Sequence, residues 1–159
     1  MNRTTVLVLA VLGCGSVSSA VRSSARDAFF VVRSADVRWS TCPADSAGCA
    51  PSFVLQGDPE KTGPFTIRVK TPAGWRVAPH YHAQAECVTV LGGGPFFIGT
   101  GDAVDDGQRT QQVGPGDFYC MPGGVHHFAW ASGETVLQVQ GTGPDERTFV
   151  RHPGELPTK

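Results

Sequence analysis

Histidine is the residue type in this sequence whose placement points most directly to chemistry. Four of the five histidines lie in two close pairs, His80 with His82 and His126 with His127. On a β-strand, residues i and i+2 project from the same face about 7 Å apart, so His80 and His82 can converge on one ion. Glu86 has the same parity, and a short bend would return its carboxylate to that face. A third imidazole from the distant pair, His126 or His127, would complete the site. Three neutral imidazoles and one carboxylate suit one divalent transition metal ion (Fe, Mn, Zn, Ni or Cu) and leave positions open for water or substrate.

Short strands must carry these side chains, because much of the sequence alternates between apolar and polar residues. Phe65, Ile67 and Val69 alternate with polar neighbours, which is the period-two pattern of a half-buried strand. Residues 52–56 have the composition of a short strand, and the stretch 29–39, rich in valine and aromatic residues, is strand-like as well. Glycine and proline occur in nearly every gap, and no capped segment is long enough for a helix. The pattern predicts an all-β, antiparallel sandwich or barrel.

Two motifs in the chain resemble those of the cupin superfamily. The first, G-x5-HxH-x3,4-E-x6-G, is matched at every fixed position, and the second, G-x5-PxG-x2-H-x3-N, is matched at all but the last, which is Ala131. The matching residues are Gly74, His80, His82, Glu86 and Gly93, followed by Gly116, Pro122, Gly124 and His127. The resemblance implies a cupin jelly-roll β-barrel that holds its metal on His80, His82, Glu86 and His127. The missing asparagine is not a ligand in the family pattern, so its loss is expected to spare the metal site.

The choice between the adjacent His126 and His127 rests on this motif. Parity places His126 on the same face as the bulky Phe128 and Trp130, and it places His127 with two alanines. Periodicity alone therefore slightly favours an inward His126. The motif spacing favours His127, and a ligand at the start of a strand can precede the regular alternation. We expect His127 to face the metal.

Length and composition indicate one folded domain. The chain has 159 residues, 40% of them hydrophobic and 17% charged, and its 20 glycines and 12 prolines fit a turn-rich β protein. We expect the cupin domain to span residues 29–150, followed by a tail at 151–159. The net charge is −1 without any basic run, which argues against nucleic acid as a partner.

The first twenty residues have the order of a secretory signal. A positive start is followed by a short apolar run and by small residues that end at Ala20, so we expect residues 1–20 to be a signal peptide and 21–28 a leader. The run is too short to span a bilayer. The residues before Cys14 also resemble a bacterial lipobox, so a lipid anchor at Cys14 is an alternative, and a buried N-terminal strand is another. Export to the periplasm, the cell surface or the medium is the prediction.

Four cysteines remain after Cys14. Cys42 and Cys49 flank a polar loop that a disulfide could staple in an oxidising compartment. Cys87 and Cys120 lie in apolar strand-like runs, and we expect both to be buried as small hydrophobic side chains.

The resemblance implies several functions without selecting one. The leading hypothesis is a metal-dependent oxidoreductase of the dioxygenase type that acts on a small molecule, with Gln138 and Gln140 as candidates to line its cavity. The alternative is a non-catalytic, metal-dependent binding, sensing or scaffold domain. Residues 57–68 also resemble the cupin half of zinc-binding anti-sigma factors, but those proteins act in the cytoplasm and carry a helical domain that is not predicted here. Pairing into a homodimer is expected from the family.

Overall fold

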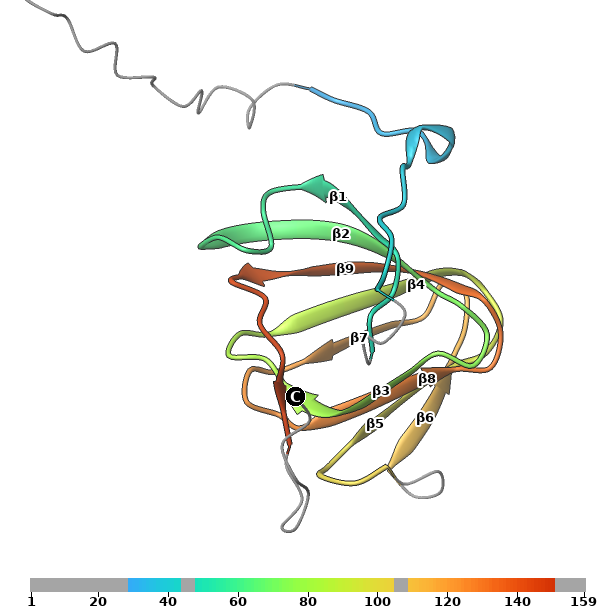
Figure 1. Ribbon diagram of the computed structural model, residues 1–159, viewed down its shortest axis with the longest axis vertical. Helices are drawn as coiled ribbons and strands as arrows, with labels where there is room; N and C mark the ends of the chain where they lie inside the picture. The colour runs from blue at the N-terminus through green and yellow to red at the C-terminus, as the bar shows by residue number, and fades with distance from the viewer. Residues whose placement is uncertain (1–28, 44–47, 105–108, 151–159) are drawn as a thin grey trace, which may run out of the picture. The chain divides into compact units, whose positions relative to one another are not determined.

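The computed structural model describes residues 29–43, 48–104 and 109–150. Within these ranges the regular structure is almost entirely strand, with one short 3-10 helix, η2, at Ser34–Asp36. The described residues between Val32 and Val150 belong to one compact unit that contains every strand in Figure 1. The strands are β1 (Ser52–Gln56), β2 (Gly63–Thr71), β3 (Arg76–Tyr81), β4 (Glu86–Gly93), β5 (Phe96–Thr100), β6 (Thr110–Val113), β7 (Phe118–Met121), β8 (His127–Ala131), β9 (Thr135–Gly143) and β10 (Thr148–Phe149).

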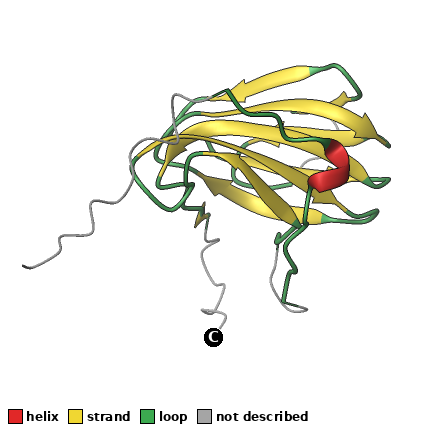
Figure 2. Cartoon of the chain, turned by 90° about the horizontal axis from the view of Figure 1, so that it is seen from above, coloured by secondary structure: helices red, strands yellow, loops and turns green. Residues whose placement is uncertain are grey.

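The strands form two five-stranded sheets with antiparallel pairing throughout. The order is β1-β2-β9-β4-β7 in the first sheet and β10-β3-β8-β5-β6 in the second. Strand β9 lies between β2 and β4 and pairs with both along nearly its whole length. The two sheets lie one over the other as two layers (Figures 1 and 2). This arrangement confirms the predicted all-β, antiparallel architecture.

The hydrophobic core fills the space between the inner faces of the two sheets. Along β2, Phe65 is 3% exposed, and Ile67 and Val69, which share its parity, pack against the core from the same face. Each large apolar side chain buried in this way stabilises the fold by about 1.5–3 kcal/mol. The core is built from both sheets by Phe65, Val77, Val88, Val90, Phe96, Ile98, Met121, Ala129, Ala131, Leu137 and Val139.

Residues 29–39 do not form the strand that their composition predicts. The chain turns through η2 within this stretch, and the first three side chains, Phe29, Phe30 and Val31, are exposed. A strand needs a partner, and among the described residues hydrogen bonds join this part of the chain to β1 only at Ser40 and Ser52, where the Ser40 amide donates to the Ser52 carbonyl and the Ser52 amide donates to the Ser40 hydroxyl. The prediction of a strand at residues 29–39 was therefore wrong. A high content of valine and aromatic residues favours a strand only where a neighbouring strand is available to pair with it.

Two disulfides are present among the described residues. The predicted pair Cys42–Cys49 is confirmed. The second, Cys87–Cys120, corrects the expectation that these residues are buried hydrophobic side chains. The two residues lie directly opposite each other on β4 and β7, and their side chains face outward because the adjacent Val88 points into the core. Strand register decides this pairing, and a single sequence does not reveal register.

The predicted signal peptide (1–20), the leader (21–28), Cys14 and the tail (151–159) all lie outside the described residues. Among the residues that the structure does describe, there is no helix of sufficient length and apolar character to cross a membrane.

Candidate metal centre

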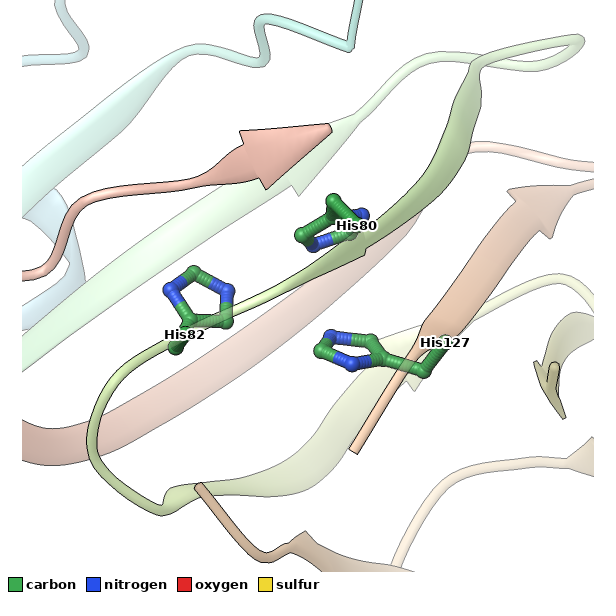
Figure 3. Close-up of side chains that lie close together, drawn as sticks. All are labelled: His80, His82 and His127. Carbon is green, nitrogen blue, oxygen red and sulfur yellow. The ribbon is translucent and has the colours of Figure 1, made fainter. Parts of the chain in front are cut away.

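Four side chains from both sheets meet between the two layers. His80 lies on β3, His82 follows the end of that strand, Glu86 begins β4 and His127 begins β8. Strands β3 and β8 pair directly, so His80 stands opposite His127. One nitrogen from each of the three rings lies within 4.8 Å of the other two, and Figure 3 shows the rings gathered around a common space. All three histidines are buried, with exposed fractions of 3–6%.

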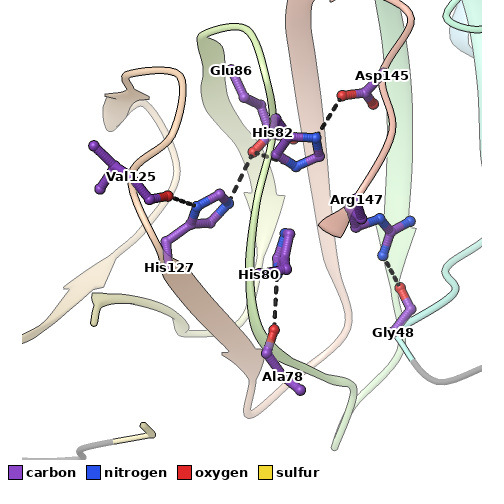
Figure 4. Close-up of polar contacts among 9 residues, drawn as sticks. All are labelled: Gly48, Ala78, His80, His82, Glu86, Val125, His127, Asp145 and Arg147. Atoms are coloured by element: carbon purple, nitrogen blue, oxygen red, sulfur yellow. Dashed lines mark hydrogen bonds and ion pairs between the residues drawn. The ribbon is translucent and has the colours of Figure 1, made fainter. Parts of the chain in front are cut away.

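The Glu86 carboxylate closes this group from the other sheet. Its Oε2 atom lies 3.7 Å from His127 Nε2 and 4.0 Å from His82 Nε2 (Figure 4). Two ligands bound to one ion at about 2.1 Å each are separated by roughly 3.0–3.4 Å. The observed separations are slightly longer than that, so small rotations of the side chains would bring the donor atoms to coordination distance.

Hydrogen bonds fix which nitrogen of two rings faces this space. Nδ1 of His80 lies 2.8 Å from the Ala78 carbonyl oxygen, and Nδ1 of His127 lies 2.9 Å from that of Val125. A carbonyl oxygen only accepts, so each Nδ1 carries the hydrogen and each Nε2 keeps its lone pair. Nε2 of His127 is buried and has no hydrogen-bond partner among the described residues. Such an atom is costly unless it is satisfied, and a metal ion would satisfy it.

Asp145, which the sequence analysis did not single out, supports the third ring. Its Oδ1 atom lies 3.0 Å from His82 Nδ1, although the angle departs from that of a well-formed hydrogen bond. Burial lowers the pKa of His82, but the contact with Asp145 and the charges of Glu86 and Asp145 outweigh burial, and the net pKa is raised. A carboxylate behind a histidine in this way orients the ring and increases its basicity as a ligand.

Burial also sets the charge of His80. Desolvation, with smaller contributions from the neighbouring charges of His127, His82 and Arg147, lowers the pKa of His80 to about 4, despite the hydrogen bond to Ala78. His80 is therefore neutral at physiological pH and ready to donate its lone pair. Burial likewise raises the pKa of the Tyr119 phenol well above its usual value, with the charge of Glu86 adding to the effect, so Tyr119 is present as the neutral phenol.

His126 points away from this group, as the motif spacing predicted. Its Nδ1 atom lies 2.6 Å from Asp102 Oδ1, and its ring stacks on that of Tyr81. Parity favoured an inward His126 because it shares a face with Phe128 and Trp130, which are large and were expected to face the core. They instead stack parallel to each other on the outer face of the second sheet, where Phe128 is fully buried against Gly99.

The loop that follows β3 and the loop that precedes β8, which belong to the two sequence motifs, hold each other in place. The Gly124 amide donates to the His82 carbonyl at 2.8 Å, and Gly124 has a φ of +77° that favours glycine. A Cβ on Gly123 would collide with the backbone of Ala83, so the loops can approach this closely only with glycine there. At the other end of β8, Ala131 is held by backbone bonds to Gly74 and Trp75 in place of any asparagine side chain.

A cavity of about 150 Å³ opens beside the four side chains and continues between the sheets. Apolar side chains line most of it, and Tyr119, Asp145 and Arg147 add polar groups. Gln138 and Gln140 do not line the cavity, which corrects the earlier expectation, because Leu137 and Val139 take the inward positions of β9. The two glutamines share a face, as their parity requires, but it is the outer one.

No protein-family model matches the chain, and no curated protein matches it. Several solved structures, however, are similar to this chain in fold. An RmlC-like cupin from Shewanella frigidimarina has a TM-score of 0.55 at 16% identity over 72% of this chain and 91% of its own. The DMSP lyase DddQ from Ruegeria pomeroyi has a TM-score of 0.57 at 20% identity, covering 76% and 64%. An oxalate oxidase in complex with glycolate has a TM-score of 0.51 at 20% identity, covering 70% and 60%.

These likenesses confirm the fold that the motifs implied. The protein has the cupin fold, an antiparallel jelly roll of two sheets. Within that fold it carries a buried group of three histidines that could hold a metal ion.

Proposed function

We propose that this protein is an exported, metal-dependent oxidoreductase of the dioxygenase type, which acts on a small molecule inside the barrel. His80, His82, Glu86 and His127 would hold one divalent transition metal ion. The observation that carries the proposal is the convergence of three buried imidazole nitrogens on one space, with a carboxylate oxygen 3.7 Å from one of them.

The donor set fits such an ion and leaves room for a reactant. Three neutral nitrogens and one carboxylate oxygen suit Fe, Mn, Ni, Cu or Zn, and a six-coordinate ion would keep two positions open. When bound, an iron, manganese or copper ion would supply the redox chemistry that dioxygen requires. Fold alone does not select the reaction, since the structures of similar fold include both an oxidase and a lyase.

The protein's own residues would prepare the site in three ways. Asp145 orients His82 and increases its basicity, and Glu86 offsets the charge of the ion. The apolar side chains in the cavity wall would limit the access of water to the ion and so reduce side reactions. Tyr119 keeps its proton because of burial, so its hydroxyl can donate a hydrogen bond to a bound ligand.

Export rests on the sequence of the first twenty residues, and the disulfides support it. Two disulfides occur among the described residues, and disulfides persist in oxidising compartments outside the cytosol. Sequencing the N-terminus of the mature protein tests export, and a start after Ala20 is expected.

Metal analysis followed by oxygen uptake tests the function. The protein purified from its producing cells should contain about one equivalent of iron, manganese or copper. His127→Ala should lose that metal, whereas the matched variant His126→Ala should retain it, because His126 lies outside the group. The loaded protein should consume dioxygen with a small organic substrate, which a library of such compounds would reveal. Tightly held zinc without oxygen uptake would refute the oxidoreductase and favour a non-catalytic binding domain.

A further inference from the structure

The segment that follows β9 closes one side of the cavity. Residues 144–150, here called the C-terminal strap, leave the first sheet and join the second as β10 (Figure 1). Asp145 and Arg147 are two residues apart, and both line the cavity, whereas Glu146 between them does not. Phe149 continues the same parity, and its ring lies 5.7 Å from that of His80. The strap therefore presents one face to the site.

Arg147 is the only positively charged side chain in the lining of this cavity, among the residues that the structure describes. Its guanidinium donates to the Gly48 carbonyl at 2.8 Å, which steadies the side chain (Figure 4). This bond engages one of the five N–H groups of a guanidinium. The carboxylate of Asp145, two residues away, is directed to His82 instead.

The charges around the cavity favour a ligand with one negative charge. Glu86 and Asp145 are the two acids in the lining, and together they balance a divalent ion. The positive charge of Arg147 then remains without a counter-charge in the lining. Arg147 is itself exposed, so its charge is hydrated when no ligand is present, and a bound anion that accepts charge-assisted hydrogen bonds from it would be favoured over a cationic ligand.

The remaining walls define the body of that ligand. Most of the residues in these walls are apolar, chiefly Val88, Phe96, Ile98, Ala129, Leu137 and Val139, and Ser52, Thr71 and Tyr119 add hydroxyl groups. Phe96 stands opposite Ala131, four residues along β8 from His127, so the cavity extends roughly 13 Å from the histidines. An engineered apolar cavity of about 150 Å³ binds benzene. A ligand with an apolar body of about that size fits the volume found here.

We propose that the cavity binds a small monocarboxylate with an apolar body, and that Arg147 is the residue that selects the carboxylate. The proposal rests on the metal-binding function above, since the charge balance includes the divalent ion. A carboxylate matches the guanidinium because two parallel N–H groups can bind its two oxygens. The apolar body would then lie along β5, β8 and β9.

Calorimetric titration of the zinc-loaded full-length protein tests this selection without turnover, because zinc has no redox chemistry. The probes are benzoate with its neutral isostere benzamide, and hexanoate with hexanamide. At least one carboxylate should bind ten or more times tighter than its amide. Arg147→Met should remove that preference while leaving the zinc content and amide binding unchanged. The control Arg76→Met, whose side chain lies over Trp130 away from this cavity, should behave like the unmodified protein.

The outcomes separate this inference from the proposed function. Equal binding of carboxylates and amides, no binding of either carboxylate, or a preference that survives Arg147→Met would overturn the role of Arg147. Failure to take up stoichiometric zinc would instead overturn the metal site itself. The preference of the unmodified protein is informative even if the Arg147 variant does not fold.

Discussion

Replacing Asp145 with asparagine should weaken metal binding while keeping the shape of the site. The carboxylate is 20% exposed and lies 3.0 Å from a ring that is 7% exposed, so the contact is largely shielded from water. Loss of a group behind a metal-binding histidine costs about 10–100-fold in affinity. Because the contact is not well aligned as a hydrogen bond, we expect the lower part of that range. The expected loss is about 1.4–2 kcal/mol, or ten- to thirtyfold.

Competition with a chromophoric chelator at pH 8 measures this loss. Asp102→Asn is the matched control, because Asp102 also contacts Nδ1 of a histidine, but that histidine is His126 on the outside. The pH dependence provides a second test. Asp145 contributes to the raised pKa of His82, so protons compete with the metal up to a higher pH in the unmodified protein. The gap between Asp145→Asn and the unmodified protein should therefore narrow from pH 8 to pH 6. Equal affinities at pH 8, or equal losses in both variants, would refute the role of Asp145.

Two further predictions concern stability. The pKa of His80 is about 4 in the folded chain and about 6.5 in the unfolded chain. At a pH between these two values the imidazole is protonated in the unfolded chain but neutral in the folded chain, which favours unfolding. The metal-free protein should therefore lose up to about 3 kcal/mol as the pH falls from 6.5 to 4, and urea unfolding should show a smaller loss for His80→Asn. Separately, a Cβ on Gly99 would clash with the Phe128 ring, so Gly99→Ala should destabilise the fold by about 1–3 kcal/mol. Gly92→Ala, which meets open space, is the control, and equal melting temperatures for the two variants would contradict the packing argument.

The candidate metal ligands could be predicted from the sequence where the spacing between residues determines which face of a strand they share. The i, i+2 relation of His80 and His82 and the matching parity of Glu86 follow from strand periodicity, and the resemblance in motif spacing selected His127. Periodicity alone would have chosen His126, because it assumes that bulky residues face the core. The second sheet breaks that assumption by burying Phe128 on its outer face.

Residues that depend on long-range pairing were not predictable from the sequence. Asp145 and Arg147 reach the site because the C-terminal strap crosses from one sheet to the other, and a short polar stretch carries no sign of that path. The alternation of Asp145, Arg147 and Phe149 was the only available signal, and it is too short to distinguish a strand from a loop. The Cys87–Cys120 disulfide depends in the same way on the register of β4 and β7.

The position of β9 has a consequence for synthesis of the protein on the ribosome. Strands β1, β2, β4 and β7 are all translated before β9, yet β9 is the strand that joins the β1-β2 pair to the β4-β7 pair. Until β9 has been made, any pairing of β1 with β2 and of β4 with β7 leaves one edge of β2 and one edge of β4 unpaired. Such edges recruit other strands, so a product truncated before β9 would aggregate or be degraded instead of forming a smaller domain. The first sheet is thus completed only when β9 pairs with both β2 and β4.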